Sequence, residues 1–292
     1  MSGTLYLLPC PISETPPAQT LPAATLATAR RLTRFFVEAA RTARATLKRM
    51  EHPAPIASLA IEEIGHDPAP EKIDAWLAPV LAGEDAGILS ESGCPGIADP
   101  GAQIAARAHE LGIRVVPLTG PSSLLLALMA SGLDGQRFRF LGYLPVHEDE
   151  RRAAVLKAES RSAASETQLV IETPYRNTAL LAALIETLSP ATRLTIALDV
   201  TGPAERIETH RVEDWRRLSE EARTLPKTPC VFLFLAPPKK GGAPRYAPEN
   251  ARRKGDGRPQ GASGRRPEGR PSGGSGNSGG SGRKSSGRRS RS

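Results

Sequence analysis

The stretch that decides the fold is LSESGCPGIADPG, Leu89 to Gly101, which comes directly after a short apolar run. Its thirteen residues include three glycines, two prolines and few large side chains. An ordinary surface turn needs one or two such residues. So many of them after a strand indicate a backbone that is shaped to approach a ligand closely.

On both sides of this stretch, apolar strand patterns alternate with helical patterns, which is typical of an α/β fold. Residues 23–50 read as mainly helical, with a possible strand at 34–39. This alternation of strands and helices, together with the length, fits two α/β domains, 1–118 and 119–238. The other expected strands are 4–9, 85–91, 113–118, 167–173, 193–200, 204–212 and 230–236, and the other expected helices are 71–83, 101–112, 120–133, 148–164, 176–188 and a short one to about 222.

Positive charge is concentrated in residues 239–292, which hold 15 of the 39 lysines and arginines but 3 of the 31 acidic residues. This segment carries a net charge of +12, so the preceding residues carry −4. It also holds 14 of the 27 glycines and few apolar side chains, and we expect a disordered tail. Two roles remain open: a solubilising extension, or an arm that binds nucleic-acid phosphates in a salt-sensitive way.

The remaining composition argues against several classes of protein. Cys10, Cys94 and Cys230 lie far apart and the five histidines form no cluster with them, so neither a disulfide framework nor a metal site is expected. The first residues lack the pattern of a signal peptide, and no apolar stretch approaches the roughly 20 residues of a membrane span. We expect a cytoplasmic protein.

Several common enzyme motifs are missing from the sequence. It has no G-x-G-x-x-G after a strand and no G-x-x-x-x-G-K-[ST], the loops that bind dinucleotides and nucleoside triphosphates. It also has no H-E-x-x-H, and its match to G-x-S-x-G, GNSGG at 276–280, lies in the glycine-rich segment 239–292 and does not follow a strand pattern. A conventional dinucleotide, triphosphatase, hydrolase or zinc-protease site is therefore disfavoured.

Four motifs follow one another at compatible distances: SESGCPGIADPG (90–101), GIRVVPLTGPSS (112–123), FLGYLPVHEDERR (140–152) and ETPYR (172–176). In order and spacing they resemble the tetrapyrrole (corrin/porphyrin) methylase family. Within it they are similar to the branch that methylates a ribose 2′-oxygen of a cytidine in small-subunit ribosomal RNA. The resemblance runs from about residue 4 to residue 236.

The resemblance implies that S-adenosylmethionine binds in a cleft between the two α/β domains, against the glycine- and proline-rich loop. Small residues there would let backbone groups reach the cofactor. A plain strand-to-helix connection is the alternative for the loop, and simple helix capping is the alternative for Ser122 and Ser123. The cofactor-binding residues implied are Pro11, Gly93, Cys94, Pro95, Ile97, Ser122, Ser123, Glu172, Val200, Thr201 and Cys230.

Three arginines are candidates for substrate binding. Arg151 and Arg152 follow the third motif and Arg176 ends the fourth. Phosphate contact beside the cleft is one reading of Arg151 and Arg152, and a solvated helix face is the other.

The sequence also departs from the pattern of the ribosomal RNA branch. PCPISET (9–15) stands where that branch has A-T-P-I-G-N-L, and LDVTG (198–202) stands where it has R-E-L-T-K. Glu91 replaces an Asp, Tyr175 replaces a His, and VEAARTAR (37–44) stands in place of A-E-D-T-R. The lost basic residues bear on the identity of the substrate more than on the fold or the cofactor.

The activity that the resemblance implies is methyl transfer from S-adenosylmethionine to a ribose hydroxyl of ribosomal RNA, without a metal. The acceptor hydroxyl would lose its proton to a base, for which Asp99, Glu172 and Asp199 are the acidic candidates. Two alternatives are a methylase of tetrapyrrole-like small molecules, and a cofactor-binding protein that joins RNA or ribosomes without transferring methyl groups. The resemblance also implies a homodimer.

Overall fold

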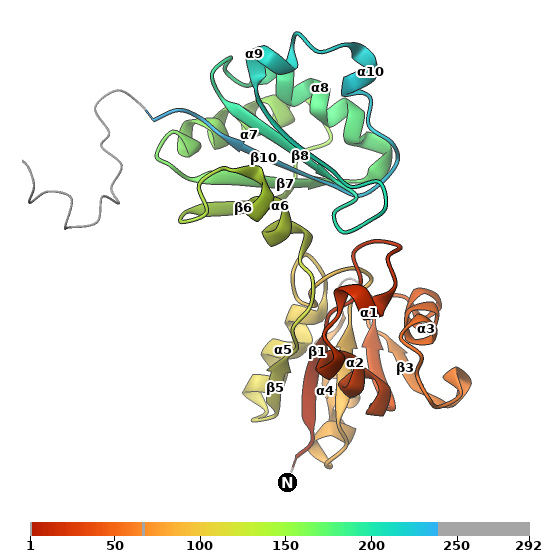
Figure 1. Ribbon diagram of the computed structural model, residues 1–292. Helices are drawn as coiled ribbons and strands as arrows, with labels where there is room; N and C mark the ends of the chain where they lie inside the picture. Colours follow the sequence, from red (N-terminus) through yellow and green to blue (C-terminus); the bar gives the residue numbers. More distant parts are fainter. Residues whose placement is uncertain (1, 66–67, 239–292) are drawn as a thin grey trace, which may run out of the picture. The chain divides into compact units, whose positions relative to one another are not determined.

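In the computed structural model, which describes residues 2–65 and 68–238, the first half of the chain forms a five-stranded sheet (Figure 1). All its neighbouring strands run parallel, in the order β3-β2-β4-β1-β5. Open parallel sheets bind ligands beyond the carboxyl ends of their strands. The strands are β1 (Thr4–Leu8), β2 (Arg34–Val37), β3 (Ala60–Glu63), β4 (Ala86–Leu89) and β5 (Arg114–Pro117).

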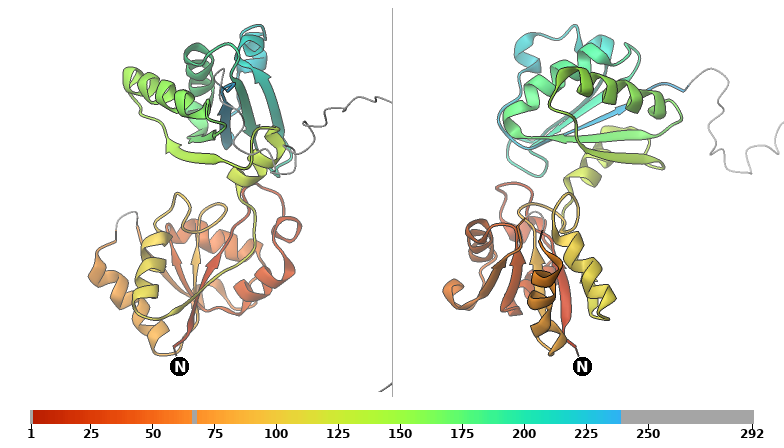
Figure 2. Two further views of the ribbon diagram at one scale, coloured as in Figure 1. Left: turned by 90° about the vertical axis from the view of Figure 1, so that its left-hand side faces the viewer. Right: turned by 180° about the vertical axis from the view of Figure 1, so that it is seen from behind.

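Helices cover both faces of this first sheet (Figure 2). Successive side chains of a strand point to opposite faces, so the neighbours Phe35 and Phe36 of β2 enter different clusters. Phe35 packs with Leu47 of α3, and Phe36 packs with Leu77 of α4. The helices of this half are α1 (Pro17–Thr20), α2 (Ala23–Arg31), α3 (Ala40–Arg49), the 3₁₀ turn η1 (Ile56–Ser58), α4 (Pro70–Leu81) and α5 (Gly101–Glu110).

The second half forms a mixed sheet of five strands in the order β6-β7-β10-β8-β9. The pair β6 and β7 is parallel, and the other neighbours are antiparallel. The carboxyl ends of β7 and β8 and the start of β10 therefore lie at the same end of the sheet. The strands are β6 (Phe138–Tyr143), β7 (Thr167–Glu172), β8 (Arg193–Leu198), β9 (Arg206–Arg211) and β10 (Cys230–Leu235).

Both faces of the second sheet are also covered. Phe232 of β10 packs among residues of α7, α8 and α9, including Trp215, whose Nε1 donates to the Leu194 carbonyl at 2.9 Å. Val231, its neighbour, packs against Leu128 of α6 on the other face. The helices are α6 (Ser123–Ser131), α7 (Glu148–Ser162), η2 (Pro174–Arg176), α8 (Asn177–Thr187), α9 (Val212–Trp215) and α10 (Glu220–Arg223).

The expected α/β class is confirmed, and most differences lie at element ends. The possible strand at 34–39 is real and is β2, and it divides the helical stretch 23–50 into α2 and α3. Strands β6 and β3 were not among the expected strands. The sequence of β3, AIEE, has two acids in four residues and no apolar alternation, so it gave no strand signal. Strand β3 is an edge strand, and its side chains are half-buried or exposed.

Both sheets lie in one compact unit of the chain. The expected disordered tail, 239–292, lies outside the described residues. Among the described residues, no helix is long and apolar enough to cross a membrane.

Candidate ligand pocket at the strand ends

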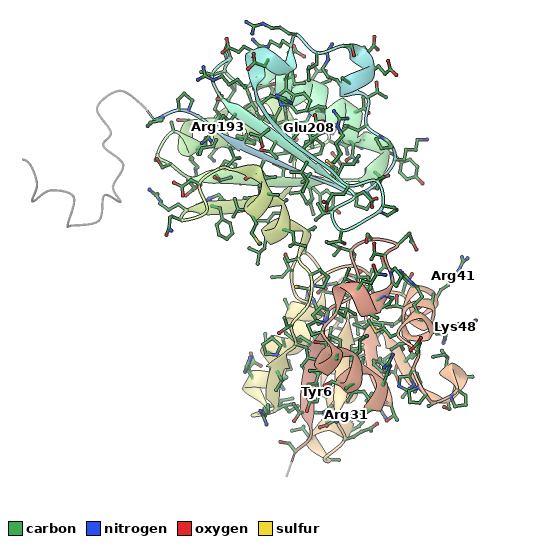
Figure 3. The ribbon with its side chains drawn as sticks, in the orientation of Figure 1. Tyr6, Arg31, Arg41, Lys48, Arg193 and Glu208 are labelled. Carbon is green, nitrogen blue, oxygen red and sulfur yellow. The ribbon has the colours of Figure 1, made fainter. Side chains whose placement is uncertain are left out.

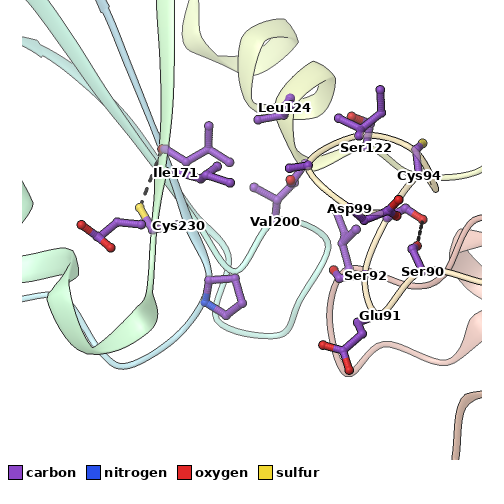
Figure 4. Close-up of a pocket in the computed structure, with 18 of the residues that line it drawn as sticks. Ser90, Glu91, Ser92, Cys94, Asp99, Ser122, Leu124, Ile171, Val200 and Cys230 are labelled. Atoms are coloured by element: carbon purple, nitrogen blue, oxygen red, sulfur yellow. Dashed lines mark hydrogen bonds between the residues drawn. The ribbon is translucent and has the colours of Figure 1, made fainter. Parts of the chain in front are cut away.

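A pocket with a volume of about 450 Å³ lies beyond the ends of β1, β4, β7 and β8 (Figure 4). This size is in the ordinary range for small-molecule sites. Its lining combines apolar side chains, hydroxyls and carboxylates. The lining residues are Ile12, Glu38, Ser90, Glu91, Ser92, Gly93, Cys94, Ile97, Ala98, Asp99, Ser122, Ser123, Leu124, Phe140, Tyr143, Ile171, Glu172, Thr173, Pro174, Ala197, Val200, Pro229, Cys230 and Val231.

The glycine- and proline-rich loop forms one wall of the pocket and is tied to the loop after β1. Gly93 and Cys10 exchange two backbone hydrogen bonds, with N···O distances of 2.9 and 3.2 Å. The Ser90 hydroxyl also donates to the Gly93 carbonyl at 2.8 Å. Gly93 has φ +71°, a conformation that favours glycine, and an added Cβ would lie 3.3 Å from Ile12 Cγ2 and crowd that side chain.

Asp99 holds the second half of this loop. Its Oδ1 accepts from the backbone N–H groups of Gly96 at 2.6 Å and Gly101 at 2.8 Å. A Cβ on Gly101 would lie 2.9 Å from that oxygen, so only glycine lets the helix α5 begin so close to the carboxylate. Asp99 Oδ2 is buried and has no hydrogen-bond partner among the described residues. Burial raises the pKa of Asp99, and the two N–H donors only partly oppose this.

The start of α6 supplies a second wall. Ser122 is the residue before the first helical turn, yet its side chain makes no capping bond, and Ser123 begins the helix. Both residues line the pocket, and neither hydroxyl has a hydrogen bond to another described residue. Figure 4 shows Ser122 above the loop that carries Cys94 and Asp99. These hydroxyls are available to a polar ligand.

The second sheet contributes Glu172 and Cys230, which pair across β7 and β10. Glu172 is 6% exposed, and both its carboxylate oxygens are engaged: Oε1 accepts from the Thr173 N–H at 2.7 Å, and Oε2 lies 3.1 Å from Arg176 Nη2. Burial raises the pKa of Cys230 to about 12 and raises the pKa of Cys94. The pocket thiols are therefore protonated at neutral pH and are not nucleophiles.

An irregularity in β6 turns two aromatic rings into the pocket. Phe140 pairs with Leu169, and Tyr143 pairs with Ile171. The two pairs are three residues apart on β6 but two residues apart on β7, so β6 contains a β-bulge, in which Gly142 has φ +69°. Without the bulge, residues three apart would point to opposite faces of the sheet. With it, both rings line the pocket, and the sequence pattern alone gave no sign of this.

The charged side chains in the pocket lining are all acidic. The lining contains four carboxylates, Glu38, Glu91, Asp99 and Glu172, and no lysine or arginine among the described residues. Such a lining favours a ligand whose net charge is positive or zero over one that carries several phosphates or carboxylates.

Most of the cofactor-binding residues that the resemblance implied lie around this one pocket. Those in its lining are Gly93, Cys94, Ile97, Ser122, Ser123, Glu172, Val200 and Cys230. Pro11, Pro95 and Thr201 are not in the lining, although Pro11 and Pro95 are buried beside residues that are. Of the acidic candidates, Asp99 and Glu172 line the pocket, whereas Asp199 accepts from the Ala204 N–H at 2.9 Å and does not.

The candidate substrate arginines also lie outside the lining. Arg151 donates to the Val146 carbonyl at 2.8 Å, and Arg152 lies 4.0 Å from Glu186. Arg176 pairs with Glu172 and so touches a lining residue. Sequence reasoning missed Glu38, which follows the buried strand β2 inside the divergent run VEAARTAR; an acid directly after a buried strand was the available signal.

Thr201 instead joins two loops that depart from the family pattern. Its Oγ1 lies 3.0 Å from Ser13 Oγ, and its carbonyl accepts from Thr15 Oγ1 at 2.5 Å. Arg49 of α3 holds the same loop by donating to the Glu14 and Thr15 carbonyls at 3.1 and 3.2 Å. The segments 9–15 and 198–202, both of which depart from the family pattern, are therefore in direct contact.

The fold and the pocket define an α/β protein with two sheets and a pocket of small-molecule size where strands of both sheets end. Residues 22–215 match the model of the family described as Tetrapyrrole (Corrin/Porphyrin) Methylases. The chain belongs to this family.

Curated relatives carry the name Ribosomal RNA small subunit methyltransferase I. The protein from Micromonospora olivasterospora is 35% identical over 191 residues, which cover 64% of this chain and 56% of that protein. The one from Mesorhizobium japonicum is 35% identical over 133 residues, which cover 46% of this chain and 44% of that protein. The chain thus spans about half the length of the curated relatives it matches.

Solved structures share the fold at low sequence identity. A conserved hypothetical protein from Aeropyrum pernix K1 is similar with a TM-score of 0.60 and 15% identity, over 82% of this chain and 86% of that one. A diphthine synthase is similar with a TM-score of 0.56 and 15% identity, and the match covers 80% of this chain and 90% of that one.

Proposed function

We propose that this chain is an S-adenosylmethionine-dependent methyltransferase that acts on a ribose 2′-oxygen of small-subunit ribosomal RNA. The observation that carries the proposal is the charge of the pocket, whose lining has four carboxylates and no lysine or arginine among the described residues. The family and the names of the curated relatives point to the same activity.

The residues of the pocket fit this cofactor. The sulfonium and the amino group of S-adenosylmethionine are cationic, and the carboxylates complement them. The hydroxyls of Ser122 and Ser123 line the pocket without a hydrogen bond to another described residue, so they can bond polar groups of the cofactor. When bound, the cofactor supplies an electrophilic methyl group.

Different residues of the pocket would contact different sides of the cofactor. Gly93, Cys94 and Ile97 would line one side of the cofactor, and Ser122 and Ser123 would donate or accept hydrogen bonds at the start of α6. Glu172, Val200 and Cys230 would close the side of the second sheet. We keep Pro11, Pro95 and Thr201 as supports of this lining.

Asp99 is the best placed of the three acidic candidates to take a proton from the acceptor hydroxyl. Its Oδ2 has no partner among the described residues, whereas both oxygens of Glu172 are engaged and Asp199 binds the Ala204 N–H. The raised pKa of Asp99 moves it toward the range where a carboxylate accepts protons well. Its bonds to Gly96 and Gly101 fix its position.

The same charge argues against a tetrapyrrole substrate. Tetrapyrrole precursors carry several carboxylates, which the four acids of the lining would repel. A ribose hydroxyl is neutral, so it can enter while its phosphates stay outside. A small-molecule methylase and a binding protein without transferase activity remain the alternatives.

The wider assignments are also proposals. We propose two methylase domains, 1–118 and 119–238, a cytoplasmic location and a homodimer, the last from family resemblance alone. The basic segment 239–292 would contact nucleic acid, because it carries a net charge of +12. Arg151 and Arg152 each engage one guanidinium nitrogen, so their other N–H groups would contact phosphates, and Arg176 would do so by loosening its pair with Glu172.

A methyl-transfer assay with radiolabelled cofactor tests the proposal directly. The full chain would be offered cell RNA, small ribosomal subunits and porphyrinoids in parallel. We expect label in the ribosomal RNA, and nuclease digestion should place it on a ribose. Label on porphyrinoids alone would contradict the proposal, and cofactor binding without any transfer would favour the binding protein.

A further inference from the structure

We infer that the exposed face of α3, formed by Arg41, Arg44 and Lys48, is the surface that holds the phosphate backbone of the RNA beside the pocket. The inference rests on the proposed function and names the surface on which the partner docks. A pocket lining without lysine or arginine cannot neutralise phosphates, so cations near its rim have to do so.

The three side chains share one face of the helix. They stand at positions i, i+3 and i+7, which lie on the same side of an α-helix and span about 10 Å. All three residues are exposed, and none has an ion pair with another described residue. Figure 3 shows Arg41 and Lys48 projecting from this helix into solvent.

This arrangement weakens the helix. Arg41 stands in the first turn of α3, where the helix dipole favours anions, and the anion at this helix start is the Glu63 carboxylate on the Ala40 N–H. The like charges at Arg41, Arg44 and Lys48, three and four residues apart, also repel one another. Bound phosphates would relieve the repulsion among the three cations.

Most other arginines of the body are neutralised by acids. Arg31 pairs with Asp85, Arg107 with Asp74 and Glu110, and Arg206 with Glu208. The first 238 residues carry a net charge of −4, so a run of cations on one face is not a property of the general surface. The α3 face stands out in charge from the body around it.

The position of α3 connects this face to the pocket. Glu38 lines the pocket, and Arg41 follows three residues later, a stretch of chain that spans at most about 10 Å. The Glu63 carboxylate accepts from the Ala40 N–H at 2.5 Å and holds the start of the helix in place. A nucleotide whose ribose entered the pocket would have phosphates within reach of Arg41.

The partner is an RNA backbone rather than a membrane surface. A helix that lies on a membrane inserts its apolar face, but the apolar face of α3 is already buried in the protein. Ala43 and Leu47 are 5% and 0% exposed and pack in the cluster around β2. Only the charged face remains, and it suits a polyanion in water.

The experiment uses the full chain and two triple variants with the same change of charge. The test variant is Arg41→Gln/Arg44→Gln/Lys48→Gln. The control is Lys72→Gln/Arg114→Gln/Lys157→Gln, whose residues are exposed and also have no ion pair among the described residues. Binding of a fluorescent oligouridylate is measured across a salt series, and cofactor binding by calorimetry.

Each lost phosphate contact to single-stranded RNA should make the slope of log affinity against log salt concentration shallower by about 0.7. The test variant loses three cations, so its slope should be shallower than the wild-type slope by about 2. Its affinity deficit should then grow about a hundredfold for each tenfold dilution of salt. The control should keep the wild-type slope, and both variants should keep the wild-type cofactor affinity, which also shows that they fold.

Equal slopes for the test variant and wild type would overturn the inference, as would an equal loss in the control. Binding to phosphatidylglycerol vesicles that is lost in the test variant, with RNA binding unchanged, would assign the face to a membrane and also overturn it. Failure of the wild type to bind S-adenosylmethionine would refute the proposed function alone, and the slopes would still decide the role of α3.

Discussion

The pocket lining and the exposed face of α3 carry opposite charge although Glu38 and Arg41 are three residues apart. The lining holds four carboxylates and no lysine or arginine among the described residues, and its polar groups are partly bound to the chain itself. The α3 face holds three cations, none of them in an ion pair with another described residue. Under the two proposals, the first region binds a small cationic ligand and the second binds a large anion.

This difference separates two kinds of recognition in one molecule. Fixed hydrogen bonds and a closed shape select a small molecule and depend little on salt. Surface cations attract phosphates from a distance and lose affinity as salt rises. Variants of the two regions should therefore differ in which ligand they affect and in how salt changes the result.

The largest effect should come from deleting residues 239–292, which carry a net charge of +12. If this segment neutralises about five to eight phosphates, the full chain should show a log–log salt slope of roughly −4 to −7 on RNA, and deletion should make it much shallower. Cofactor affinity should stay nearly unchanged. Binding of both chains to ribosomal RNA over a salt series measures this, and equal slopes would leave the segment only a solubilising role.

Asp99→Ala should have the next largest effect and act on the pocket alone. It removes the acceptor of the Gly96 and Gly101 N–H groups, so we expect a loss of about 2–4 kcal/mol in the free energy of unfolding. Cofactor binding should fall with it, whereas the salt slope on RNA should not move. Urea unfolding and calorimetry measure both effects.

Asp99→Asn is the matched control, because its side-chain oxygen can still accept both N–H bonds. It should keep most of the stability. Loss of methyl transfer in Asp99→Asn with cofactor binding preserved would support Asp99 as the proton acceptor. Full activity in that variant would exclude this role.

The α/β class was predictable because strand and helix periodicities are local properties of the sequence. The same is true of the loop 89–101, whose glycines and prolines constrain the backbone directly. The edge strand β3 was not predictable, since its AIEE sequence forms a strand only because β2 offers a partner. Pairing with a neighbour can override a weak local preference.

The site was predictable where small residues mark close approach of the backbone, as at Gly93 and Ser122. It was not predictable where side chains are redirected by tertiary structure. Phe140 and Tyr143 reach the pocket only through a bulge in β6. Thr201 leaves the lining because it bonds Ser13, and that contact spans 188 positions of the chain.

Gly93→Ala should have a smaller effect and can be compared with Gly132→Ala. Both glycines have nearly the same φ, +71° and +67°, so both variants should lose about 1–2 kcal/mol from backbone strain. Only Gly93 lines the pocket and would place its Cβ against Ile12, because Gly132 has open space around it. Calorimetry should show weaker cofactor binding for Gly93→Ala alone, and equal affinity in the two variants would remove Gly93 from the site.

The smallest effect should be a pH dependence that Asp99 introduces into stability. Burial raises its pKa in the folded protein above the usual 3.8, so between these two values the folded state binds more protons than the unfolded state. The free energy of unfolding should therefore fall as pH rises through this window and level off above the folded pKa. Asp99→Asn cannot titrate, so the stability of wild type relative to this variant should decline from low pH to neutral pH. Urea unfolding of both proteins over a pH series measures the difference, in which carboxylates common to both cancel. A relative stability that rises with pH would mean that Asp99 is stabilised as the anion, and the pocket would then hold its charge without a ligand.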